Sequence, residues 1–221
     1  MVIPECGDVF IDGILYRVGF KSAAVMRYNY RAGTKVTIPR IVNNVPVMHV
    51  AENAFKGTDI EIVNLPDTCR YIGEGAFENC HNLTMVSIHN LPKMAGLNIG
   101  SRAFAGCELL KTVDVPNGLL WLEAGVFVGC DKLELITGKL FYTRENVFRN
   151  CNNLLGLIIA QNAHISSKTF ENAQPKTLSI EGKMSRPSRN MFLRLKDTKI
   201  LCDDQFPFWD LVYEGYHIES V

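Results

Sequence analysis

Four cysteines that recur at a similar spacing are the first residues in this sequence whose side chains could do chemistry. They are Cys80, Cys107, Cys130 and Cys151. A row of thiols suits a metal or redox ladder, but zinc requires paired ligands at short spacing, and the sequence contains no Cys-x-x-Cys pair. A reduced cysteine inside a protein otherwise packs as a small apolar side chain. We therefore expect these four cysteines to form a buried structural row with no metal.

A group of carboxylates near the C-terminus is the second candidate for chemistry. Asp203, Asp204, Asp210 and Glu214 fall within a short segment, and paired carboxylates can act as acid and base in hydrolysis or bind a cation. A solvated end of the fold explains the same residues and is the favoured interpretation. The five histidines show no HExxH spacing, and the sequence has no GxGxxG or GxxxxGK(S/T) phosphate loop. The sequence thus predicts a protein that is not an enzyme and uses no cofactor, with a hydrolase as the least favoured alternative.

The elements that would position these side chains follow from an internal repeat. Each of the four cysteines lies three residues after a phenylalanine, and seven phenylalanines recur at intervals of 22, 27, 23, 21, 22 and 22 residues. They are Phe55, Phe77, Phe104, Phe127, Phe148, Phe170 and Phe192. Alternating apolar pairs, such as Val86 with Ile88, keep the same register and are typical of a half-buried strand. Because such a short unit cannot bury its own apolar face, the repeats must stack into a solenoid.

Two copies of the repeat carry a resemblance to a known family. YIGEGAFENC at residues 71–80 and LKTVDVP at residues 110–116 are similar to the BspA-like leucine-rich repeat. The resemblance extends over residues 34–202 and implies a curved solenoid that mediates protein–protein adhesion, often in a surface or host-interacting role. We therefore expect a mainly β, helix-poor solenoid of about seven rungs, where a rung is one repeat of 21–27 residues.

The chain is expected to form one structural domain with a cap at each end, because a solenoid exposes open edges. Residues 1–33 are predicted to be an N-terminal β cap with two strands that turn at Asp12-Gly13. Residues 34–199 form the solenoid, and the aromatic-rich segment 200–221 forms a C-terminal cap. The long repeat contains an insert at residues 89–98, which is either a tolerated surface loop or part of a binding face.

Two outward-facing sets of residues are candidates for partner binding. The first lies between the buried positions of the main strands and is unusually apolar: Ile62, Met85, Leu135 and Ile158. The second lies six residues before each phenylalanine: His49, Tyr71, Asn98, Trp121, Tyr142, His164 and Arg186. Tyr, Trp and Arg are enriched in binding hot spots, although flat side chains one strand apart can also simply stack on one another.

Charge narrows the class of partner. The chain has 23 Lys and Arg against 23 Asp and Glu, so its formal net charge is zero, which disfavours nucleic-acid binding. A basic cluster comprises Lys183, Arg186, Arg189, Arg194 and Lys196. This cluster either steers an acidic partner or pairs with Asp203 and Asp204. No apolar stretch is long enough for membrane insertion, and the N-terminus does not resemble a secretory signal, so a cytoplasmic location is expected.

The sequence therefore predicts a scaffold that binds a protein partner through the strand face and the aromatic column, for instance an inhibitor or modulator of a host protein. The main alternative is a secreted or virion-displayed adhesin or structural protein that self-associates as a homo-oligomer. Both functions follow from the shape of a repeat protein rather than from particular residues.

Overall fold

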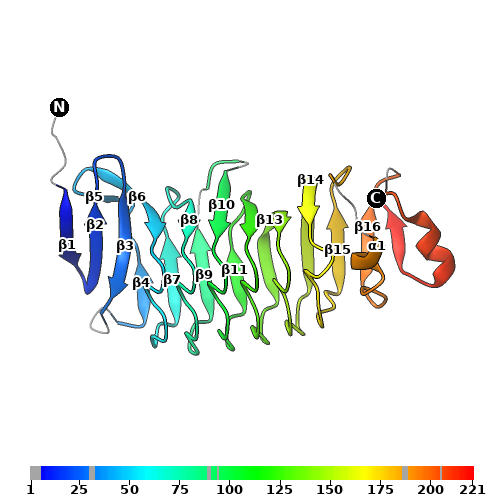
Figure 1. The fold of residues 1–221 in the computed structure, drawn as a ribbon, viewed down its shortest axis with the longest axis horizontal. Helices are drawn as coiled ribbons and strands as arrows, with labels where there is room; N and C mark the ends of the chain where they lie inside the picture. The colour runs from blue at the N-terminus through cyan, green and yellow to red at the C-terminus, as the bar shows by residue number, and fades with distance from the viewer. Residues whose placement is uncertain (1–5, 30–32, 89–90, 94, 186–188, 205) are drawn as a thin grey trace.

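The computed structural model describes residues 6–29, 33–88, 91–93, 95–185, 189–204 and 206–221. The chain winds into an elongated, mainly β solenoid of about eight turns with its two ends far apart (Figure 1). The strands are β1 (Gly7–Ile11), β2 (Ile14–Val18), β3 (Ala23–Tyr28), β4 (Lys35–Thr37), β5 (Ile41–Val42), β6 (Val45–Val50), β7 (Ile62–Leu65), β8 (Tyr71–Ile72), β9 (Met85–Ile88), β10 (Gly96–Ile99), β11 (Thr112–Asp114), β12 (Leu119–Leu122), β13 (Leu135–Thr143), β14 (Gly156–Ile165), β15 (Thr177–Ile180), β16 (Lys199–Cys202) and β17 (Ile218–Ser220). The helices are α1 (Arg189–Phe192) and the 3₁₀ helix η2 (Trp209–Glu214).

The strands form two parallel columns that belong to one sheet. The first column runs through β4, β7, β9, β11, β13, β14, β15, β16 and β17. The second column runs through β3, β6, β8, β10, β12, β13 and β14. Because β13 and β14 are long enough to contribute to both columns, the two columns join into one continuous surface (Figure 1).

The repeated phenylalanines mark the third side of each rung. We call the six tight turns around them the Phe turns: residues 53–58, 75–80, 102–107, 125–130, 146–151 and 168–173. The rings of Phe55 and Phe77 stack with centroids 4.9 Å apart, and the stack continues to Phe148 and Phe170 at 5.5 Å. This separation follows from the spacing between neighbouring strands, which is about 4.8 Å. The ring stack therefore holds the rungs in register from Phe55 to Phe170.

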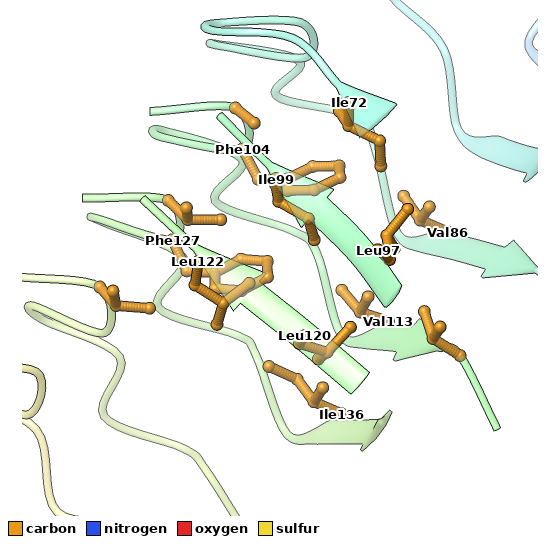
Figure 2. Close-up of a cluster of buried hydrophobic side chains, with 14 of the residues drawn as sticks. Ile72, Val86, Leu97, Ile99, Phe104, Val113, Leu120, Leu122, Phe127 and Ile136 are labelled. Atoms are coloured by element: carbon orange, nitrogen blue, oxygen red, sulfur yellow. The ribbon is translucent and has the colours of Figure 1, made fainter. Parts of the chain in front are cut away.

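The interior is filled by apolar side chains that point inward from the sides of each rung. Figure 2 shows Ile72, Ile99 and Leu122 of the second column pointing toward the ring stack at Phe104 and Phe127. All five are at most 1 % exposed. Fully burying an aliphatic or aromatic side chain of this size contributes roughly 1.5–3 kcal/mol, so the repeated apolar positions supply most of the stability of the fold.

The N-terminal cap has three strands, not the two expected from the sequence. β1, β2 and β3 pair antiparallel, and the predicted turn between β1 and β2 is present, with φ of 46° at Asp12 and 78° at Gly13. Two consecutive positive φ values are the requirement of a type I′ hairpin turn. β3 then pairs parallel with β6, so the cap continues directly into the second strand column.

The strand column also continues past residue 200. β16 pairs in parallel with β15, with Leu178 opposite Ile200, and β17 pairs in parallel with β16. Beyond β16, the rings of Phe206 and Phe208 pack on Phe192, with centroids 5.0 and 5.7 Å apart. The C-terminal segment thus adds two strands to the solenoid and covers its last rung with aromatic side chains.

Candidate partner-binding surface

The second set of candidate residues forms one row across the second strand column. Direct register partners connect His49 to Tyr71, Tyr71 to Asn98, Asn98 to Trp121, Trp121 to Tyr142, and Tyr142 to His164. We call these six residues the aromatic row. Arg186, the seventh candidate, lies outside the described residues. Residues that the sequence separates by 21–27 positions are therefore brought one strand apart, as the repeat requires.

Neighbouring rings in the aromatic row contact one another. The rings of Tyr142 and His164 stack with centroids 5.7 Å apart and planes 15° apart. Those of His49 and Tyr71 are 6.2 Å apart and tilted by 57°. Both alternatives from the sequence thus have a counterpart: the rings stack partly on themselves, and they remain half-exposed, with 39 % of Tyr71 accessible.

Trp121 has a structural role in addition to its place in the aromatic row. A Cβ atom at Gly96 would lie 2.6 Å from Cζ3 of Trp121, so the indole covers the glycine on the neighbouring strand. The indole of Trp121 also packs on the ring of Phe141, with ring centroids 4.9 Å apart. Next to it, the Oδ1 atom of Asn98 is buried and accepts no hydrogen bond from any described residue.

A shallow hollow of about 320 Å³ lies at one end of the aromatic row. Its lining consists of Ala124, Tyr142, Thr143, Arg144, Glu145, His164 and Ser166. The guanidinium of Arg144 pairs with Glu123 at 2.5 Å, which neutralises the charge beside the two rings. The hollow thus offers ring edges, hydroxyl groups, a paired guanidinium and the carboxylate of Glu145.

The first set of candidates lies on the first strand column and forms two neighbouring rows. Ile62 and Met85 are direct register partners, and Leu135, with 41 % exposed, follows after Thr112. Ile158 occupies the adjacent row, opposite Ser179. A hydrogen-bonded polar ladder runs beside the first two residues: Asn64 Nδ2 donates to Thr37 Oγ1 at 3.1 Å, and Ser87 Oγ donates to Asn64 Oδ1 at 2.7 Å.

The structure places all four repeated cysteines in the interior. Each is fully buried, and each thiol donates to the carbonyl oxygen of a phenylalanine in the preceding rung, at 3.0 Å for Cys80 and 3.1 Å for Cys107, Cys130 and Cys151. Burial raises the pKa of the Cys151 thiol to about 12. Within the described part of the chain, no group of three or more His, Cys, Asp and Glu residues is arranged to hold a metal ion.

The repeat, the solenoid and the phenylalanine stack agree with a family description. The BspA type leucine rich repeat region matches the chain in six copies, over residues 29–98, 48–175 and 89–199. The chain belongs to this family. No curated protein matches it.

A solved structure of a leucine-rich repeat protein shares the fold. A leucine rich cell surface protein from Faecalibacterium prausnitzii A2-165 aligns with a TM-score of 0.65 and 20 % identity over 91 % of this chain and 56 % of its own. This BspA-type chain therefore spans just over half the length of that protein. A leucine-rich repeat protein from Bacteroides capillosus ATCC 29799 aligns with a TM-score of 0.46 and 25 % identity, over 66 % of this chain and 94 % of its own.

The family description identifies a repeat scaffold rather than a class of enzyme. Two of the C-terminal carboxylates, those of Asp210 and Glu214, form ion pairs with Arg189. Of the basic cluster, Arg189 thus pairs with Asp210 and Glu214, whereas Arg186 lies outside the described residues. Each helix that the structure describes is too short and too polar to cross a bilayer.

Two features of this BspA-type chain escaped the sequence analysis. Glu78 is 8 % exposed and is held by Lys56 at 2.7 Å and Arg102 at 2.9 Å, three residues drawn from three consecutive Phe turns. Lys56 and Glu78 each lie one residue after a phenylalanine, whereas Arg102 lies two residues before Phe104, so no single column of the repeat contains the whole cluster. The second is an opening between the last Phe turn and α1, for which the only signal was the decay of the repeat at Phe192.

Proposed function

We propose that this chain is a scaffold that binds a protein partner through the aromatic row, with the apolar residues of the first strand column extending the contact. Modulation of a host protein, which the family resemblance suggests, is the finer form of the same proposal. The observation that supports it is the direct register of His49, Tyr71, Trp121, Tyr142 and His164 on a half-exposed face.

The chemistry of this row suits protein recognition. Tyrosine and tryptophan present a large rigid surface with a polar tip, and they lose little conformational entropy when a partner covers them. Rings that already stack, as Tyr142 and His164 do, are preorganised, so ordering them on binding costs less. The apolar side chains of Ile62, Met85 and Leu135 lie on the same continuous sheet and would add buried area at the edge of the contact.

The test compares two double variants of the chain as bait for proteins from the native host. The row variant carries Tyr71→Ala and Tyr142→Ala. The control variant carries Phe20→Ala and Tyr213→Ala, which remove two exposed rings, 74 % and 95 % accessible, from outside the aromatic row. Capture is quantified by mass spectrometry after circular dichroism has shown that both variants are folded.

We expect at least one protein whose capture falls roughly tenfold or more with the row variant and stays unchanged with the control variant, because hot-spot residues each contribute about 2 kcal/mol or more. Equal capture by the two variants would overturn the proposal for this row. A stable homo-oligomer in light scattering that the row variant abolishes would instead favour the self-associating structural protein.

A further inference from the structure

The backbones of the Phe turns form a hydrogen-bonded ladder that stops abruptly at one place. Three N–H to carbonyl bonds join each of the first four pairs of neighbouring turns, as in the bond from Phe55 N–H to Ala76 O at 2.8 Å with its neighbours from Asn53 and Gly57. The turns around Phe148 and Phe170 share two such bonds. Among the described residues, no backbone bond joins the turn around Phe170 to the segment around Phe192.

The cause of the break is the helix that replaces the next Phe turn. In α1 and the residues after it, carbonyl groups accept from within the segment: Arg189 O from Leu193 N–H at 3.0 Å, and Met191 O from Arg194 N–H at 3.2 Å. In the earlier turns the carbonyls of Ala76 and Ala103 accept from the preceding Phe turn, whereas the equivalent carbonyl of Met191 accepts from within its own segment. The N–H groups of Phe170 and Asn172, whose equivalents in earlier turns donate to the next rung, therefore have no acceptor among the described residues.

Two hollows open along this break, which we call the seam. The larger one, about 450 Å³, is lined by Asn152, Phe170, Asn172, Ala173, Gln174 and Arg194. The smaller one, about 390 Å³, is lined by Ser167, Lys168, Asn190, Leu193 and Arg194. The two residues with open N–H groups thus line the same hollow as Arg194, and Arg194 lines both.

The seam is rich in donors and poor in negative charge. Arg194 forms no ion pair with any described residue, and Lys168 lies 4.0 Å from its nearest carboxylate, that of Glu145. Basic residues also outnumber acidic ones across residues 161–200, although the whole chain is neutral. An accessible backbone N–H group beside a guanidinium suits an anion, and the planar guanidinium matches a carboxylate in two hydrogen bonds.

We propose that the seam binds a carboxylate of an acidic peptide segment in a protein partner, with Arg194 as the principal contact and the open N–H group of the exposed Asn172 as a supporting donor. Side-chain amides of Asn152 and Gln174 are suited to hydrogen-bond the peptide backbone on either side. A polypeptide is favoured over an acidic sugar because the only ring that lines the hollows, that of Phe170, is 1 % exposed and offers no face for a sugar to stack on. The site lies on a different side of the rung from the aromatic row and does not depend on it.

The probe for this site is a fluorescein-labelled hexaglutamate peptide, with binding followed by fluorescence anisotropy at low and at physiological salt. Arg194→Gln is compared with Arg149→Gln, which removes the same charge from an exposed arginine of the preceding Phe turn that lines neither hollow. Thermal unfolding confirms that both variants are folded. We expect Arg194→Gln to weaken binding roughly tenfold or more, Lys168→Gln to weaken it less, and Arg149→Gln to leave it nearly unchanged.

Three results would overturn the proposal. They are an absence of binding by the wild type, an equal loss with Arg149→Gln and Arg194→Gln, and stronger competition by tetragalacturonate than by unlabelled hexaglutamate. The row variant, with Tyr71→Ala and Tyr142→Ala, is expected to bind the peptide as the wild type does. A failure of the aromatic row as a binding surface is therefore measured separately from a failure of the seam.

Discussion

The thiol of Cys107 donates a hydrogen bond to the carbonyl oxygen of Phe77, 3.1 Å away in the preceding rung. The same oxygen accepts from the backbone N–H of Cys80 at 3.1 Å. Both lone pairs of a buried carbonyl are thus used, one within its own turn and one between rungs. The repeated cysteines therefore link each rung to the one before it, which explains why a small residue with a donor recurs at this position.

Replacement of Cys107 by Ala is expected to lower the free energy of unfolding by about 1–2 kcal/mol, because it removes the thiol donor and leaves a small void beside a buried carbonyl. Urea denaturation followed by circular dichroism measures the change. The reverse substitution is Ala173→Cys, because Ala173 occupies the cysteine position of the turn around Phe170. Ala173 also lines the larger hollow of the seam. We expect this change to be neutral or to stabilise the protein by up to about 1 kcal/mol. A loss of stability with Ala173→Cys, together with no loss for Cys107→Ala, would contradict the proposed role of the thiols.

The buried thiols also predict how stability depends on alkaline pH. Burial raises the pKa of Cys69 and Cys151 from 9.0 to about 12, so the folded protein holds these protons at pH values where the unfolded chain has lost them. The contribution of these thiols to the free energy of unfolding is complete below pH 9 and is lost as the pH rises from 9 toward 12. At pH 10 each such thiol is expected to lower the free energy of unfolding by about 1.4 kcal/mol relative to pH 8.

Urea denaturation of the wild type and of Cys151→Ala at pH 8 and pH 10 measures this effect. The variant is expected to lose about 1.4 kcal/mol less than the wild type between the two pH values, because it lacks one of the titrating groups. Alkylation gives an independent measurement, since exposed Cys6 should react rapidly with iodoacetamide in the folded protein while Cys151 reacts on unfolding. Equal pH dependence of the two proteins would contradict the assignment.

The spacing of the phenylalanines predicted the architecture because each ring must stack on the next at one strand separation. The positions of Phe77, Phe104 and Phe127 therefore carried the register of the whole solenoid, and the register in turn placed Tyr71, Asn98 and Trp121 in one row. Such positional information is present in the sequence because every repeat uses the same geometry.

Features that differ from one repeat to the next could not be predicted in this way. The indole of Trp121 covers Gly96 because a large side chain on one strand lies beside a glycine on the neighbouring strand. Neither repeat by itself contains this match. The pairing of Arg189 with Asp210 and Glu214 depends on the path of the chain after the last repeat. The third strand of the N-terminal cap, β3, was missed because the second turn, at residues 19–22, contains no Asn-Gly or Asp-Gly pair like the one at Asp12-Gly13.

Replacement of Gly96 by Ala is expected to displace the indole of Trp121. The new Cβ would lie 2.6 Å from Cζ3, closer than van der Waals contact allows, so the ring must move away from the strand. We expect a loss of about 1–3 kcal/mol in the free energy of unfolding and a red shift of tryptophan fluorescence, because the displaced ring becomes more exposed.

Gly156→Ala is the matched control for this change. Its Cβ would meet the carbonyl oxygen of Thr177 at 3.7 Å, an ordinary contact, and the residue lies at the equivalent edge of a strand in the first column. The control is expected to change stability by less than about 0.5 kcal/mol. Identical fluorescence and stability for the two variants would show that the indole does not rest on Gly96.

The ion cluster around Glu78 predicts a dependence on acid. Hydrogen bonds from Lys56 and then Arg102 hold the pKa of the Glu78 carboxyl below its usual value of 4.5. Glu78 thus contributes stability that is complete above pH 4.5 and is lost as the pH falls toward the lowered pKa of the folded state. Glu78→Gln is expected to cost about 1–2 kcal/mol at pH 7, because two cations lose their partner beside a largely buried group.

The difference between the wild type and Glu78→Gln should shrink as the pH falls below 4.5, which urea denaturation at pH 7 and pH 3.5 measures. Glu108→Gln serves as the control, since Glu108 is exposed and faces His81 at 3.7 Å. We expect that change to stay within about 0.5 kcal/mol at both pH values. A constant difference for Glu78→Gln across the range would mean that its carboxylate is not stabilised by the two cations.

The C-terminal cap is expected to depend on Arg189, which joins α1 to η2 through ion pairs with Asp210 and Glu214. The side chain of Arg189 is partly exposed, so we expect Arg189→Gln to have little effect on the global free energy of unfolding while it loosens the segment that carries η2. Limited proteolysis measures the local effect, because cleavage within residues 206–221 should accelerate several-fold before the solenoid itself is cut. Arg149→Gln removes an equal charge from a Phe turn and is expected to leave the cleavage rate unchanged. If both variants resist proteolysis equally, the aromatic packing of Phe206 and Phe208 on Phe192 holds the cap without help from the ion pairs.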